Sequence, residues 1–222
     1  MKRHLFRACL LFFLSVSLLF LSACGEGLAA GLGFDTHDYA GEPVKTVHDP
    51  LGQVAAELSD FVSVLSLEAP ILQSFSGAKE AAEAYRDQIL SDMLSRYYAR
   101  YAGNQKLLAE AALAYPGMQL HVLIPAKDFE SVVYATFGGS EKIVNRDGAR
   151  FLYLEKIRAY TTAAPLPEGG VRTTVLRLEE TERTYRLYFE NQRGEVESPA
   201  YFALLIKRDD GSFYIAELRE ET

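Results

Sequence analysis

The chain has 222 residues, with 30 Asp and Glu against 23 Lys and Arg, so its formal net charge is −7. A negative chain repels nucleic acid phosphates, and no basic stretch laced with aromatic residues is present, so the composition argues against a nucleic-acid partner. The only cysteines are Cys9 and Cys24. Residues after Cys24 therefore form no disulfide, and the stability of that part must come from its core.

The N-terminus has the order of a secretory signal. Lys2, Arg3 and Arg7 precede residues 8–21, which are almost wholly apolar, and small residues then lead to Cys24. A membrane-spanning helix needs about 20 apolar residues, and this run is shorter. The order favours an export signal over a transmembrane anchor.

The run Leu21-Ser22-Ala23-Cys24 resembles the lipobox of bacterial lipoproteins. This resemblance implies that residues 1–23 are a lipoprotein signal peptide, and that Cys24 carries a diacylglycerol thioether after cleavage. Two acyl chains hold a protein stably at a bilayer, whereas one does not. The resemblance also implies the lipid bilayer as a partner through Cys24, and a location on the extracytoplasmic face of the cell membrane.

The next segments are predicted to be a tether and then helices. Residues 24–50, rich in Gly and acidic side chains, show no sustained period, so we expect a lipidated cysteine and a flexible tether. Helices are expected at residues 51–67, 78–102 and 105–114. The second has apolar or aromatic residues at every fourth position, which predicts a buried stripe: Tyr85, Ile89, Met93, Tyr97 and Tyr101.

After residue 117 the spacing of apolar residues changes from that of helices to that of strands. A short strand is expected at residues 118–124, followed by a helix at 126–137 that Pro125 opens and Gly138 ends. Further strands are expected at residues 149–155, 171–178, 184–190, 201–207 and 212–218. The last two are joined by Asp209-Asp210-Gly211, a hairpin signal. A loop is expected at residues 161–170.

This order of elements predicts an α+β fold, in which N-terminal helices pack on one face of a curved, mostly antiparallel sheet. We expect residues 51–222 to form a single domain.

Three short runs carry a second resemblance. They are residues 124–129 (IPAKDF), the Phe137-Gly138 stop and residues 207–214 (KRDDGSFY), and they look like a group of small, uncharacterised lipoproteins of Gram-positive bacteria. The element order and closing hairpin also resemble the nuclear transport factor 2-like cone, over roughly residues 78–218. A long loop near residues 165–170 and an extra strand depart from that pattern, and no catalytic residue of the cone's enzymes can be matched here.

One cluster has side chains of the metal-ligand type: Asp35, His37, Asp38, His48 and Asp49. A zinc site requires fixed geometry, and these residues lie in the expected tether. We therefore expect a solvated spacer, no metal and no cofactor.

Three other groups contain side chains that occur in functional sites. His121 could be a general base in a pocket, but no acidic partner is identifiable, so an ordinary sheet residue is expected. Arg96, Tyr97, Tyr98, Arg100 and Tyr101 could line a ligand pocket, but the helical period favours Tyr97 and Tyr101 in the core. The run Glu179-Glu180-Thr181-Glu182 lacks calcium-loop spacing and is expected to be a solvated hairpin tip.

Two interpretations of function remain open. The first is a non-enzymatic lipoprotein module that binds a small ligand, a wall component or another envelope protein. The second is an envelope hydrolase or isomerase of cone-like fold that uses His121 or a pocket carboxylate. The sequence contains no nucleophile elbow, phosphate-binding loop or zinc-protease helix, which favours the first.

Overall fold

The computed structural model describes residues 39, 41–67, 69–162 and 170–221. Cys24 and the expected signal peptide lie outside the described residues. In the described part of the chain, no helix is long and apolar enough to cross a membrane.

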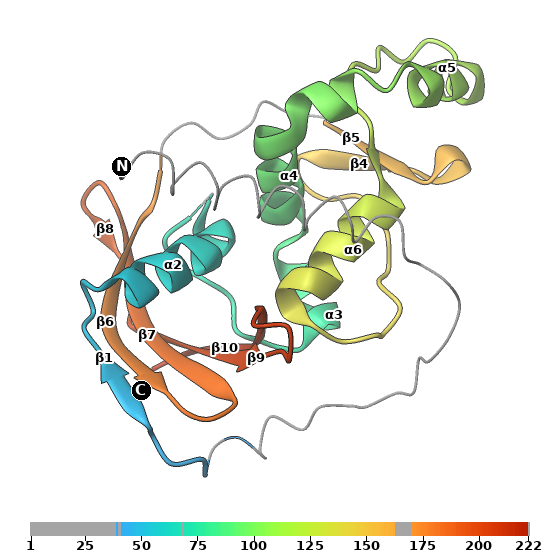
Figure 1. Cartoon of the computed structure of the whole chain (residues 1–222). Helices are drawn as coiled ribbons and strands as arrows, with labels where there is room; N and C mark the ends of the chain where they lie inside the picture. The colour runs from blue at the N-terminus through green and yellow to red at the C-terminus, as the bar shows by residue number, and fades with distance from the viewer. Residues whose placement is uncertain (1–38, 40, 68, 163–169, 222) are drawn as a thin grey trace, which may run out of the picture. The chain divides into compact units, whose positions relative to one another are not determined.

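The larger sheet is antiparallel and is built mainly from the C-terminal part of the chain (Figure 1). Its strand order is β1-β6-β7-β9-β10-β2, and β8 pairs with β7. The bounds are β1 Thr46–His48, β2 Phe75–Ser76, β6 Arg172–Glu180, β7 Thr184–Arg193, β8 Val196–Glu197, β9 Tyr201–Lys207 and β10 Phe213–Glu220. Register shifts lie between Val175 and Arg177 and between Ile215 and Glu217, and such bulges bend a sheet.

A second, three-stranded sheet has the order β3-β5-β4. Its strands are β3 Ile124–Pro125, β4 Phe151–Leu154 and β5 Ala159–Thr162, and a 3₁₀ turn, η3 Glu155–Ile157, joins the last two. The strand expected at residues 118–124 is thus reduced to its final residue, because Met118 to Leu123 make no ladder.

Five helices accompany the sheets within the described ranges: α2 Gln53–Val62, α3 Ala78–Ala84, α4 Arg86–Ala102, α5 Gln105–Ala114 and α6 Ala126–Phe137. A 3₁₀ turn, η2 Ser63–Ser66, ends the helix expected at residues 51–67. The helix expected at 78–102 is divided at Tyr85, whose φ of −119° and ψ of 20° are not helical. α2 packs against β6 of the larger sheet (Figure 1).

The main core lies between the helices and one face of the larger sheet. Leu58, Met93 and Phe129 come from α2, α4 and α6, and they belong to one apolar cluster with Leu187 and Leu205 of the sheet. The fold is therefore α+β with helices against a mostly antiparallel sheet, as the sequence predicts.

The opposite face of the sheet is also covered. Phe202, Leu204 and Ile206 of β9 form a second apolar cluster there, and Tyr39 packs against it. This explains why β9 is apolar at successive positions, since a strand buried on both faces does not alternate. The folded chain thus begins before Leu51, and residues 41–50 include β1 rather than only a tether.

The aromatic stripe of α4 is interrupted, which corrects the prediction for Tyr97. Ile89, Met93 and Tyr101 are buried, but Tyr97 is 49% exposed and Tyr98 is 58% exposed. The backbone of Tyr97 leaves helical geometry, with φ −128° and ψ 29°. Because the helical phase is broken there, the Tyr97 ring does not follow the others into the core.

Candidate functional site

A cavity of about 460 Å³ opens where α3 ends and α4 begins. Its lining comes from the α3–α4 junction and from the segment before β4. The lining residues are Glu83, Ala84, Arg86, Asp87, Gln88, Arg146, Asp147, Gly148 and Ala149. Most of these side chains are charged or polar, so the cavity suits a polar ligand better than an apolar one.

Arg86 is the buried charge of this cavity, with only 4% of its surface exposed. Its Nη2 donates a hydrogen bond to the Val144 carbonyl at 2.9 Å. Its Nε is buried and has no hydrogen-bond partner, and within the described residues Arg86 takes part in no ion pair. Arginines are rarely buried without a partner.

Tyr160 lies near Arg86 but does not neutralise it. Burial raises the pKa of Tyr160 to about 12, although the Arg86 guanidinium acts in the opposite direction. The phenol is therefore uncharged at neutral pH, and its hydroxyl lies 2.8 Å from Asn145 Oδ1, to which it donates. Among the residues that the structure describes, no negative group pairs with Arg86.

Asp87 fixes the wall of the cavity. Its Oδ2 accepts hydrogen bonds from the backbone N–H groups of Ala149, at 2.6 Å, and Arg150, at 3.3 Å. The backbone of Gly148 approaches so closely that a Cβ there would stand 2.1 Å from Asp87 Oδ1. Asp147 is also engaged, because its Oδ1 accepts from the Tyr153 N–H at 2.7 Å.

A second cavity of about 360 Å³ lies beside the start of α5. Its charged lining residues, Lys106, Glu110, Lys127 and Arg158, are exposed. Water already solvates exposed charges, so their presence does not call for a ligand. The cavity at α4 is therefore the stronger candidate.

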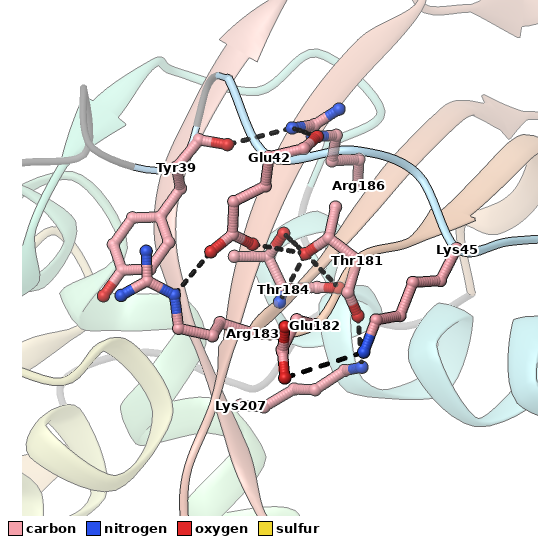
Figure 2. Close-up of polar contacts among 9 residues, drawn as sticks. All are labelled: Tyr39, Glu42, Lys45, Thr181, Glu182, Arg183, Thr184, Arg186 and Lys207. Atoms are coloured by element: carbon pink, nitrogen blue, oxygen red, sulfur yellow. Dashed lines mark hydrogen bonds and ion pairs between the residues drawn. The ribbon is translucent and has the colours of Figure 1, made fainter.

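A polar cluster joins an N-terminal arm, residues 39 and 41–48, to the turn between β6 and β7 (Figure 2). Glu42 is its centre. Glu42 Oε2 accepts a hydrogen bond from Thr181 Oγ1 at 2.6 Å, and Oε1 forms a close ion pair with Arg183. The Arg183 guanidinium also lies over the Tyr39 ring, 4.6 Å from its centroid.

Further contacts secure the arm along its length. Arg186 Nη2 donates to the carbonyls of Tyr39 and Glu42 at 2.9 and 3.0 Å. Glu180 lies between two partners, with Lys207 Nζ at 2.5 Å from Oε1 and His48 Nε2 at 2.7 Å from Oε2. The cluster holds the arm against the turn, since its groups are bonded to one another.

The polar contacts of this cluster lower the pKa values of two carboxyl groups, those of Glu42 and Glu180. Burial opposes ionisation of Glu42, but hydrogen bonds from Thr181 and Arg183 outweigh it, so the pKa of Glu42 is lowered. The hydrogen bond from Lys207, with a smaller contribution from His48, lowers the pKa of Glu180 despite its partial burial. Both groups are held ionised at neutral pH.

These contacts correct the prediction for residues 179–182. Glu179 is 5% exposed and Thr181 is completely buried, so the run is not a solvated tip. Thr181 also accepts from the Thr184 N–H at 2.9 Å, which closes the turn. Glu182 alone matches the prediction, because it is exposed and only 3.7 Å from Lys45 in a surface ion pair.

The other predicted site residues are not brought together. His121 is exposed and lies in a segment without regular structure. Tyr97 and Tyr98 are exposed, and Arg100 pairs with Asp128 at 2.9 Å rather than facing a pocket.

The metal-type residues are separated in the same way. Asp35, His37 and Asp38 lie outside the described residues, and His48 is engaged by Glu180. In the part of the chain that the structure describes, no group of three or more His, Cys, Asp or Glu side chains could hold a metal ion.

Sequence reasoning missed Arg86, although a signal was present. Arg86 precedes Ile89, Leu90 and Met93 by three, four and seven residues, and all three are buried. A charged residue in phase with a buried helical face is the pattern that marks a buried charge.

In comparisons with known proteins, no family model, no curated protein and no solved structure matches the chain. The resemblances to lipoproteins and to the nuclear transport factor 2-like cone therefore remain predictions.

Proposed function

We propose that this protein is a lipid-anchored binding module on the extracytoplasmic face of the cell membrane. The observation that carries this proposal is the run Leu21-Ser22-Ala23-Cys24 at the end of a short apolar segment with a basic start. Two acyl chains on Cys24 would hold the protein at the bilayer without any membrane-spanning helix.

The N-terminal arm, which is hydrogen-bonded to the sheet and to the β6–β7 turn, supports anchoring through Cys24. Tyr39, which contacts the sheet through its carbonyl, lies fifteen positions after Cys24. A chain of that length spans at most about 50 Å when fully extended. Docking of the arm would therefore limit how far the folded part can stand from the bilayer, and would pass any pull from the anchor to the β6–β7 turn.

The cavity at α4 supports binding of a charged ligand. Its charged centre, Arg86, is a guanidinium, which neither accepts a proton nor attacks an electrophile at neutral pH. A fixed cation in a polar cavity is suited to holding an anionic group.

The anchor is tested by labelling cells that express the full chain with a clickable fatty-acid analogue. The wild-type chain and Cys9→Ala should be labelled, because Cys9 lies in the cleaved segment. Cys24→Ala should carry no label and should retain residues 1–23, seen as a larger mass. Equal labelling of Cys24→Ala would exclude the lipoprotein assignment.

The face of the membrane is tested separately, with protease added to intact protoplasts. The anchored chain should be digested while a cytoplasmic marker protein survives. Protection of both proteins would place the chain inside the cell and contradict the proposal.

A further inference from the structure

Arg86 carries two electrostatic costs that the described chain does not offset. It is buried without a carboxylate partner, and burying an unpaired charge is strongly unfavourable. It is also the first residue of α4, where a cation meets the positive end of the helix dipole. An anionic group in the cavity would relieve both costs.

The other charges of the cavity restrict which anion can enter. Glu83 and Asp147 are exposed, whereas Arg86 is buried, so these two acidic side chains lie at the mouth, the guanidinium lies deeper, and the half-buried carboxylate of Asp87 lies in the wall. A simple anion would be repelled by these three carboxylates as it approached Arg86. A ligand that also carries a positive group would be attracted by Arg86 at the deep end of the cavity and by Glu83 and Asp147 at its mouth.

We propose that this cavity binds a small zwitterion, with its carboxylate at Arg86 and its ammonium group between Glu83 and Asp147. Free α-amino acids and short peptides have this chemistry. Arg146, exposed at the same mouth, adds a second donor for the carboxylate or for a peptide carbonyl. The inference rests on the proposed binding function and names its ligand class.

The dimensions agree with a ligand of this kind. A volume of about 460 Å³ falls within the range of ligand pockets and accommodates an amino acid or a dipeptide. Asp87 holds the loop at residues 147–150 through two backbone N–H groups, so this wall of the cavity is formed before a ligand arrives. A preformed wall lowers the entropic cost of binding.

The test is isothermal titration calorimetry on the full chain, purified in detergent. The probes are the twenty common amino acids, in small pools and then singly, and the dipeptide Ala-Ala. Acetate and ethylammonium, which carry one charge each, are the matched controls. At least one zwitterion should bind, and neither single-charge control should bind as tightly.

Three variants connect binding to the cavity. Arg86→Met should weaken binding at least about tenfold, since a charge-assisted hydrogen bond is lost. Arg146→Ala changes only an exposed residue, so it should fold normally and weaken binding by less. Lys79→Ala, an exposed cation of α3 that does not line the cavity, should bind as the wild type does.

The variants also guard against a folding artefact. Because no carboxylate of the described residues pairs with Arg86 in the free protein, Arg86→Met should unfold cooperatively with a midpoint close to that of the wild type. If Arg86→Met fails to fold, a weaker affinity of Arg146→Ala but not of Lys79→Ala decides in favour of the cavity.

The outcomes distinguish a failure of the zwitterion site from a failure of the lipid anchor at Cys24. Absence of heat with every zwitterion, or equal affinity in Arg146→Ala and the wild type, overturns the zwitterion site even if Cys24 is labelled. Tighter binding of acetate than of any zwitterion also overturns it. Zwitterion binding by a chain whose Cys24 is unlabelled would retain the site and reject the lipid anchor.

Discussion

Thr181 donates a hydrogen bond from Oγ1 to Glu42 Oε2 at 2.6 Å, and thereby joins residues that are 139 positions apart. The same oxygen accepts from the Thr184 N–H at 2.9 Å. A single buried hydroxyl thus closes the β6–β7 turn and fastens the N-terminal arm to it. The arm contact is therefore inseparable from the geometry of the turn.

Replacing Thr181 by Val should remove both hydrogen bonds of the hydroxyl, to Glu42 and from the Thr184 N–H, while preserving side-chain shape. The buried Thr184 N–H loses an acceptor and Glu42 loses a donor, so we expect a loss of about 1–3 kcal/mol in the free energy of unfolding. Urea denaturation measures it. Thr46→Val, at an exposed position of β1, is the control and should change stability by less than about 0.5 kcal/mol.

Detachment of the N-terminal arm from the sheet should also be detectable by hydrogen exchange of the arm's own amides. In Thr181→Val the backbone amides of β1 should exchange with deuterium faster than those of β9, because the arm opens before the sheet. Unchanged protection of β1 would mean that the backbone pairing of Thr46–His48 with β6 holds the arm without the side chains.

The arm contact should weaken in acid. Glu42 and Glu180 have pKa values lowered from 4.5 in the folded protein. A lowered folded-state pKa contributes stability that is fully present above the unfolded value and is lost as pH falls through the folded value. The contribution should thus be complete at neutral pH and disappear well below pH 4.5.

The variant that isolates this effect is Glu42→Gln, which keeps the shape of the side chain but cannot ionise. The wild type should be more stable than Glu42→Gln at pH 7, and the difference should shrink toward zero at pH 3. Denaturant midpoints at the two pH values provide the comparison. A difference that is constant with pH would show that the Glu42 charge contributes nothing.

Local patterns were sufficient to predict much of the fold. The helices at residues 105–114 and 126–137 and the strand at 201–207 have the bounds expected from the sequence. Each of these is specified within its own segment, by helical period, with Pro125 at the start of the second helix, or by a continuous apolar run. The α+β class follows from their order.

What depends on distant contacts could not be predicted. β1 is too short to show a period, and it exists because it pairs with β6, some 130 residues away. The burial of Thr181 depends likewise on Glu42. The helical period predicts that Tyr97 is buried, but the non-helical backbone of Tyr97 interrupts that period, and nothing in the local sequence marks that break.

The cavity at α4 should depend on a glycine at position 148. A Cβ there would stand 2.1 Å from Asp87 Oδ1 and 2.8 Å from Asp87 Cγ, so Gly148→Ala forces the loop or the carboxylate to move. We expect a loss of about 1–3 kcal/mol, as in other overpacked sites. Gly170→Ala, where a Cβ would meet nothing within 4 Å, is the matched control.

The Gly148 substitution should also affect the ligand site. Displacing Asp87 releases the backbone N–H groups of Ala149 and Arg150, and the preformed wall of the cavity is lost. Zwitterion affinity should fall together with stability in Gly148→Ala. Equal stability of Gly148→Ala and Gly170→Ala would mean that the loop relaxes without cost.

The two tyrosines of α4 should differ sharply when truncated. Tyr101 is 3% exposed, and burial raises its pKa to about 12, so Tyr101→Ala should cost about 3–5 kcal/mol, as for other buried rings. Tyr97 is 49% exposed, and Tyr97→Ala should cost less than about 1 kcal/mol. Guanidinium midpoints measured in parallel test the order. If Tyr97→Ala were the more damaging variant, α4 would continue unbroken through residue 97, and its aromatic stripe would face the core along its whole length.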